Sequence, residues 1–110
     1  MFVFQYIRNE DRPDIYDLVS GPTSTLTYVR LSPPKKGFLK KNGAKYVLES
    51  WKDNKKILFT GLQQISKNKY KGDFWNRTRG TISDLRITIS NDLNKLSIEV
   101  LNSKRKGPHR

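Results

Sequence analysis

LRITISNDLNKLSIEV, residues 85–100, is the stretch of the chain that decides the fold. Apolar and polar side chains alternate on both sides of a polar centre, which is the period of a half-buried strand and not of a helix. A four-residue loop at 91–94 predicts three apolar cross-strand pairs, Ile89 with Leu96, Ile87 with Ile98 and Leu85 with Val100. The same register puts Arg86 opposite Glu99 on the other face, where opposite charges stabilise a strand pair. The stretch therefore predicts an antiparallel hairpin.

The segments before this hairpin also alternate with period 2, and none shows a convincing 3.6-residue period. Strands are expected at the N-terminus, where Phe2, Phe4 and Tyr6 share a face, and then at Asp14–Ser20 and Thr25–Leu31. Loop residues separate them at Asn9–Pro13, Gly21-Pro22 and Ser32–Gly37.

Turn residues predict three further hairpins in the middle of the chain. Asn42-Gly43 is the strongest signal, because a type I′ turn needs positive φ at both central residues. The turn at Asn42-Gly43 predicts pairs of Leu39 with Tyr46 and of Lys40 with Lys45. A turn at Asp53-Asn54 predicts pairs of Leu48 with Phe59, Ser50 with Ile57 and Trp51 with Lys56. A turn at Lys67-Asn68 predicts pairs of Ile65 with Tyr70 and of Gly61 with Phe74.

These registers divide the side chains of the middle segment between two faces. The predicted core face consists of Leu39, Tyr46, Leu48, Ile57, Phe59, Ile65, Tyr70 and Phe74. The predicted outer face carries Lys40, Lys45, Trp51, Lys56, Lys69, Lys71 and Trp75, with Val47, Glu49, Leu58, Leu62 and Asp73 between them.

The pattern as a whole predicts an all-β domain, a small antiparallel barrel or sandwich of about eight short strands joined largely as a meander. A short helical turn at Gly61–Ser66, as an OB-type barrel would need, is the alternative to the third hairpin. Residues 1–102 are expected to form the single domain. Residues 103–110 contain no apolar anchor, so we expect a basic, mobile, disordered tail.

Composition excludes several kinds of site. The 110-residue chain has no cysteine, and its one histidine, His109, lies next to the end, so we expect no disulfide, no metal site and no cofactor. The N-terminus lacks the features of a signal peptide, and no apolar stretch is long enough to span a membrane. The sequence thus favours a cytoplasmic protein.

Positive charge is concentrated in one block of the chain. Residues 35–80 contain thirteen Lys or Arg against three acidic residues, a net charge of +10 out of the total of +12. Residues 1–34 have a net charge of −1. This balance points to a polyanionic partner, with nucleic acid the first choice.

The predicted outer face supplies a candidate interface for that partner. Lysines that lie opposite one another repel unless an anion lies between them. Backbone phosphates suit this role because they release counterions when lysines neutralise them, and nucleobases can stack on the tryptophan indoles. We therefore predict binding of nucleic acid, single strands favoured, with little sequence preference. The predicted contact residues are Lys40, Lys45, Trp51, Lys56, Lys69, Lys71, Trp75, Arg77 and Arg79. The competing interpretation is that both tryptophans cover a second layer of core, with lysine stems around them.

Three other function classes stay open. No catalytic constellation is found, so an enzyme is not expected, although Tyr70, Lys69, Arg77 and Arg79 are the residue types of a small basic RNase. A structural or adaptor subunit of a larger assembly, for example a viral one, would use Val47, Leu58 and Leu62 as an interface. A ligand-holding barrel needs a roomy interior, which the bulky aromatic residues of the core face are expected to fill.

Overall fold

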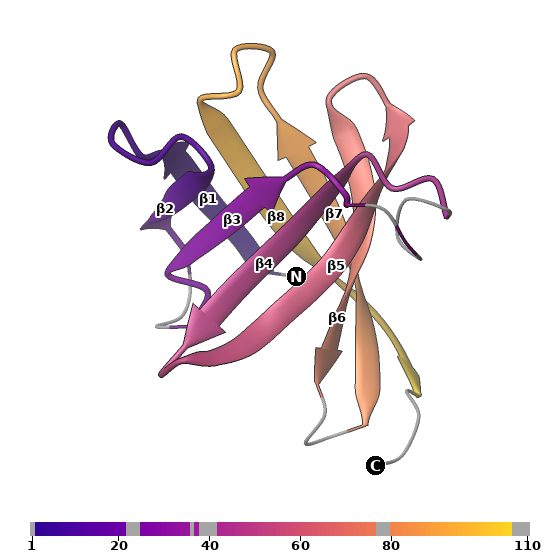
Figure 1. Ribbon diagram of the computed structural model, residues 1–110. Helices are drawn as coiled ribbons and strands as arrows, with labels where there is room; N and C mark the ends of the chain where they lie inside the picture. The colour runs from indigo at the N-terminus through magenta and orange to yellow at the C-terminus, as the bar shows by residue number, and fades with distance from the viewer. Residues whose placement is uncertain (1, 22–24, 36, 38–41, 77–79, 107–110) are drawn as a thin grey trace.

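Eight antiparallel strands form a closed barrel in the computed structural model, in which residues 2–21, 25–35, 37, 42–76 and 80–106 are described (Figure 1). Each strand pairs with the next one in the chain, and β1 pairs with β8 to close the wall. The prediction of an antiparallel all-β meander is confirmed, and the closed wall makes it a barrel and not a sandwich. The strands are β1 Phe2–Arg8, β2 Ile15–Ser20, β3 Tyr28–Ser32, β4 Tyr46–Lys52, β5 Lys55–Ser66, β6 Lys69–Asn76, β7 Thr81–Ile89 and β8 Lys95–Lys106.

The hairpin of β7 and β8 has the predicted register, including its three apolar pairs and the pair of Arg86 with Glu99. Its loop is held by Asp92, whose carboxylate accepts hydrogen bonds from the Ser90 hydroxyl at 2.6 Å and the Asn94 backbone at 3.0 Å. These bonds stabilise the charged form and lower the pKa of Asp92. Leu93 adopts the positive φ of 62° that the loop requires.

The hairpin of β4 and β5 follows the prediction only next to its turn. Asp53 and Asn54 both have positive φ, 52° and 64°, as a type I′ turn needs, and Trp51 pairs with Lys56. A β-bulge then shifts the register, so that Glu49 and not Leu48 pairs with Phe59. The predicted pairs of Leu48 with Phe59 and of Ser50 with Ile57 are therefore wrong, and an extra residue in one strand is the physical reason.

A second bulge shifts the hairpin of β5 and β6. Tyr70 pairs with Gln64 and not with the predicted Ile65, and the same shift displaces the predicted pairing of Gly61 with Phe74. Residues 61–66 belong to strand β5, so the alternative of a helical turn there is also wrong.

Asn42-Gly43 forms a turn, and Gly43 has a positive φ of 82°. The predicted partners of this hairpin, Leu39 and Lys40, lie outside the described residues. The neighbours of β4 in the barrel are β3 and β5, with Leu31 of β3 opposite Leu48.

The core fills the barrel with apolar side chains and tyrosines. Leu48 and Tyr70 are buried as predicted, and Tyr46, Ile57 and Phe74 are half-buried and pack against the core. The prediction that Phe59 and Ile65 are core residues is wrong, since they are 54% and 45% exposed. The residues of β5 that are buried in the core are instead Leu58 and Leu62, which were predicted to face outward. The core cluster consists of Phe4, Tyr6, Tyr16, Leu26, Val29, Leu31, Leu48, Leu58, Leu62, Tyr70, Leu85, Ile87, Ile89, Leu96 and Ile98.

The backbone of strand β8 continues along β7, where it pairs Lys104 with Ser83 and Lys106 with Thr81. The predicted domain boundary at residue 102 stays a prediction. Together with the ends of β6 and β7 this part of β8 projects from one end of the barrel (Figure 1). Residues 107–110 of the predicted tail lie outside the described residues, and its mobility stays a prediction.

Candidate nucleic-acid interface

The predicted contact residues that the structure describes lie on the outside of the barrel. Lys45, Lys56, Lys69 and Lys71 are exposed. Trp51 and Trp75 are half-buried, and each is adjacent in sequence to an inward-facing residue, Ser50 or Phe74. Neither tryptophan belongs to the interior cluster of the described residues. Lys40, Arg77 and Arg79 lie outside the described residues.

The structure brings Trp51 and Lys56 together, because they are paired across the β4–β5 turn. The Lys56 ammonium lies 5.6 Å from the centroid of the Trp51 ring and 4.7 Å from that of Phe59. It also forms an ion pair of 2.9 Å with Glu49. Cation–π contacts and an ion pair both favour this position of the flexible Lys56 side chain.

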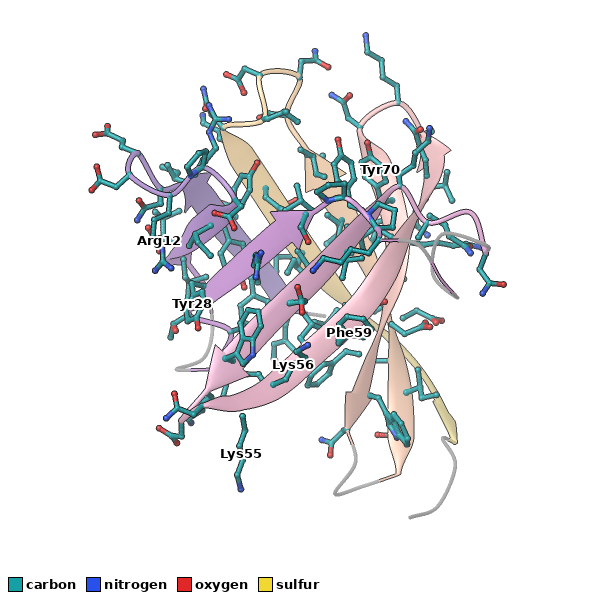
Figure 2. The ribbon with its side chains drawn as sticks, viewed as in Figure 1. Arg12, Tyr28, Lys55, Lys56, Phe59 and Tyr70 are labelled. Carbon is teal, nitrogen blue, oxygen red and sulfur yellow. The ribbon has the colours of Figure 1, made fainter. Side chains whose placement is uncertain are left out.

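Tyr28 on β3 continues this arrangement beyond Trp51. The two rings lie 6.3 Å apart between centroids and are inclined by 15°. Tyr28, Trp51 and Phe59, with Lys56 between the last two, form an aromatic row that crosses β3, β4 and β5. Figure 2 shows Tyr28, Lys56 and Phe59 along this side of the barrel, with Lys55 below them.

Sequence reasoning missed two members of the aromatic row. Tyr28 gave a usable signal, since it lies next to Val29 in an alternating segment and Val29 is fully buried. Phe59 was assigned to the core because a regular hairpin would have placed it there. The bulge makes the Phe59 side chain point outward, and the turn residues do not indicate that a bulge is present.

Two hollows flank the Tyr28–Trp51 pair. The first has a volume of about 580 Å³ and lies over the β4–β5 turn, where Lys52, Asp53 and Asn54 line it. The second, which we call the Arg12 hollow, has a volume of about 490 Å³. Its lining includes Arg12, Asp14, Asp17 and Arg30 together with the two aromatic side chains.

The predicted cationic residues of β6 have a mixed environment. Lys71 pairs with Arg86 of β7, which pairs in turn with Glu99 of β8. One row further along, Asp73 lies opposite Asp84. Carboxylates thus interrupt the line of positive charge between Lys71 and Trp75, so this surface is less basic than the sequence of β6 alone indicates.

The residues considered for an RNase are separated by the barrel wall. Tyr70 points inward and is 8% exposed, whereas its neighbour Lys69 is exposed on the outside. Burial, followed by the nearby Tyr46 phenol, raises the pKa of Tyr70, and the two rings meet edge to face at 5.5 Å. A raised pKa makes this buried phenol a poorer proton donor, and it lies on the other side of the wall from the Lys69 ammonium, so the two side chains do not come together in one site. Arg77 and Arg79 lie outside the described residues.

None of the described residues forms a helix of the length and apolarity that a membrane crossing requires. In the same part of the chain, no three or more His, Asp or Glu side chains come together in a group that could hold a metal ion. No protein-family model, curated protein or solved structure matches this chain.

Proposed function

We propose that the protein binds single-stranded nucleic acid across the outer surface of β3, β4 and β5, mainly through the phosphate backbone. The observation that carries the proposal is the aromatic row with the Lys56 ammonium fixed between Trp51 and Phe59. Aromatic rings beside exposed cations are the combination that binds unpaired bases and their phosphates together.

Single strands are favoured over duplexes because unpaired bases can reach aromatic side chains. Phe59 is 54% exposed, more than any other apolar residue of β4 or β5 that the structure describes. Trp51 has less ring surface to offer, since it is half-buried and the Tyr28 ring stacks on it. Phe59 is therefore the main stacking platform of the proposed interface, and Trp51 supports the residues around it.

Lysines close to the aromatic row provide the positive charge that would bind the phosphates. Lys52, Lys55 and Lys56 are exposed around the β4–β5 turn, and Asp53 is the acidic residue among them. Lys45, Lys69, Lys71 and Trp75 extend the proposed contact surface, as do Lys40, Arg77 and Arg79 by sequence alone. A cytoplasmic location, where nucleic acid is accessible, is part of the same proposal.

The test is the salt dependence of binding to a fluorescent 12-mer of deoxythymidine, followed by anisotropy. With about 4–6 phosphates neutralised, log K should fall with log salt concentration with a slope of about −3 to −4. Lys56→Gln should make the slope shallower by about 0.7, because one phosphate contact is lost. Lys95→Gln makes the same charge change on β8 and should leave the slope nearly unchanged. Affinity that is flat with salt contradicts the proposal.

A second candidate function is that of a subunit in a larger assembly. The interface predicted for it is wrong, because Val47, Leu58 and Leu62 are all buried, and other residues would have to supply it. Val3, Ile7 and Val19 on β1 and β2 are 41%, 47% and 59% exposed, and they lie in the part of the chain that has little net charge. Exposed apolar side chains on a sheet surface are a feature of protein interfaces. Light scattering distinguishes the two candidates, because a nucleic-acid reader should be a monomer or dimer and an assembly subunit a ring or higher oligomer.

A further inference from the structure

The Arg12 hollow differs in charge from the rest of this basic protein. Two arginines, Arg12 and Arg30, and two aspartates, Asp14 and Asp17, line it, so its lining has no net charge at neutral pH. Tyr28 and Trp51 form an aromatic wall, and the buried Ile15 contributes an apolar surface. A site with aromatic walls and balanced donors and acceptors suits a planar, uncharged ligand with hydrogen-bonding edges better than it suits a phosphate.

The loop that carries Arg12 is held in one conformation by Asn9. The Asn9 side-chain oxygen accepts hydrogen bonds from the backbone N–H groups of Asp11 and Arg12 at 2.8 and 3.0 Å. Its amide nitrogen donates to Asp17 at 2.8 Å, which ties the loop to β2. The Arg12 carbonyl also accepts a bond of 2.9 Å from Ile15. An exposed guanidinium on such a loop costs less entropy to position on a ligand.

The two carboxylates keep acceptor capacity. Asp14 accepts from Arg30 at 3.1 Å and Asp17 accepts from Asn9 at 2.8 Å, in each case through one oxygen, Oδ2. A carboxylate has about four acceptor positions, so both side chains can accept further bonds from a ligand.

We infer that the Arg12 hollow is a subsite for one guanine base of the bound strand, an inference that rests on the proposed function. Guanine presents two adjacent donors, N1–H and N2–H₂, that match a carboxylate such as Asp17. Its acceptors O6 and N7 match the planar guanidinium of Arg12. The base lies against Tyr28 and Trp51, and its phosphates reach the lysines of the β4–β5 turn. Adenine lacks the N1–H donor and the O6 acceptor, so it fills the hollow without completing these bonds.

The test compares 12-mers of deoxythymidine that carry one central guanine or one central adenine, at fixed moderate salt. The guanine strand should bind about 5- to 10-fold more tightly than the adenine strand, the lower part of the range for a bidentate base contact. Asp17→Asn replaces the carboxylate with a group of the same shape and should abolish this preference. Asp11→Asn makes the same charge change in the neighbouring β1–β2 loop, outside the lining of the hollow, and should keep the preference.

Each outcome separates the inference from the proposed function. Equal affinity for the two strands, or a guanine preference that survives in Asp17→Asn, overturns the guanine subsite while general strand binding stands. A second experiment tests the hollow without a strand: guanosine monophosphate is titrated alone, and binding is followed by NMR shifts of the Trp51 indole. If it binds in an Asp17-dependent way to a protein that binds no 12-mer, the hollow is confirmed and the strand-binding proposal is wrong.

Discussion

Thr60 and Asp73 join β5 to β6 through a side chain, since the Thr60 hydroxyl oxygen accepts a hydrogen bond from the Asp73 backbone N–H at 3.0 Å. The backbone pairs between these strands lie further along, between Gln63 and Lys71 and towards the turn. The Thr60 side chain is 7% exposed and faces the barrel interior. A side chain therefore continues the contact between two strands beyond the paired backbone.

Thr60→Val should destabilise the protein by about 1–2 kcal/mol, because it preserves shape but removes the acceptor from a partly buried N–H group. Thr88→Val is the matched control on β7, where the threonine is half-buried on the outer surface. Urea denaturation followed by far-UV circular dichroism measures both variants. An equal effect of the two substitutions would show that the bond to Asp73 contributes nothing.

Tyr6→Phe should lower stability by about 1–3 kcal/mol at pH 8, since the Tyr6 hydroxyl donates a buried hydrogen bond of 2.8 Å to the Leu26 carbonyl. Burial raises the pKa of Tyr6 above its ordinary value. The unfolded chain then ionises first as the pH rises through about 10, and the contribution of Tyr6 to stability falls from there upward.

The difference between wild type and Tyr6→Phe should consequently shrink between pH 8 and pH 11. Urea titrations at both values measure it. A difference that is constant or grows with pH would contradict the assignment of a buried, neutral phenol.

Glu49→Gln should strengthen binding to a deoxythymidine 12-mer, because it removes the carboxylate that holds Lys56 at 2.9 Å. Glu49 then no longer competes with the phosphate for Lys56, so log K should rise at each salt concentration, while the slope of log K against log salt stays near its wild-type value because the number of phosphate contacts is unchanged. Glu10→Gln changes the charge equally in the exposed β1–β2 loop and should leave the affinity near the wild-type value. If both variants bind the 12-mer more tightly by the same factor, the effect is one of net charge and Lys56 is not a specific contact.

Much of the fold follows from the sequence because alternation and turn residues are local signals. The β7–β8 hairpin is correct in every predicted pair, since its loop length alone fixes the register. The errors begin at Ile57 and Ile65, where bulges shift β5 against both neighbours. With these bulges Leu58, Leu62 and Tyr70 are all buried in the closed interior, and packing between distant strands is not expressed in the residues next to a turn.

The candidate site was predictable to the same extent. The pair of Trp51 and Lys56 was found because it is next to the turn. Phe59 was missed because it lies beyond the bulge. The Arg12 hollow was missed because all of its lining residues except Trp51 come from residues 1–34, whose net charge of −1 does not indicate a polyanion site.

Phe59→Ala provides the sharpest test of the aromatic row, because the predicted register and the observed one lead to opposite results. A core phenylalanine truncated to alanine costs about 3–5 kcal/mol of folding stability. The observed side chain is 54% exposed, so the free energy of unfolding should change little. Affinity for a single strand should instead fall by about 1–3 kcal/mol, the loss expected when a base loses its stacking platform.

Ile65→Ala is the matched control, since Ile65 lies on the same strand, is 45% exposed and was also predicted to be a core residue. It is away from the aromatic row and should change neither stability nor affinity appreciably. Urea denaturation and anisotropy titration on both variants complete the comparison. Loss of stability without loss of affinity in Phe59→Ala would exclude Phe59 as a stacking platform, and the same loss of affinity in both variants would show that the effect is not specific to the row.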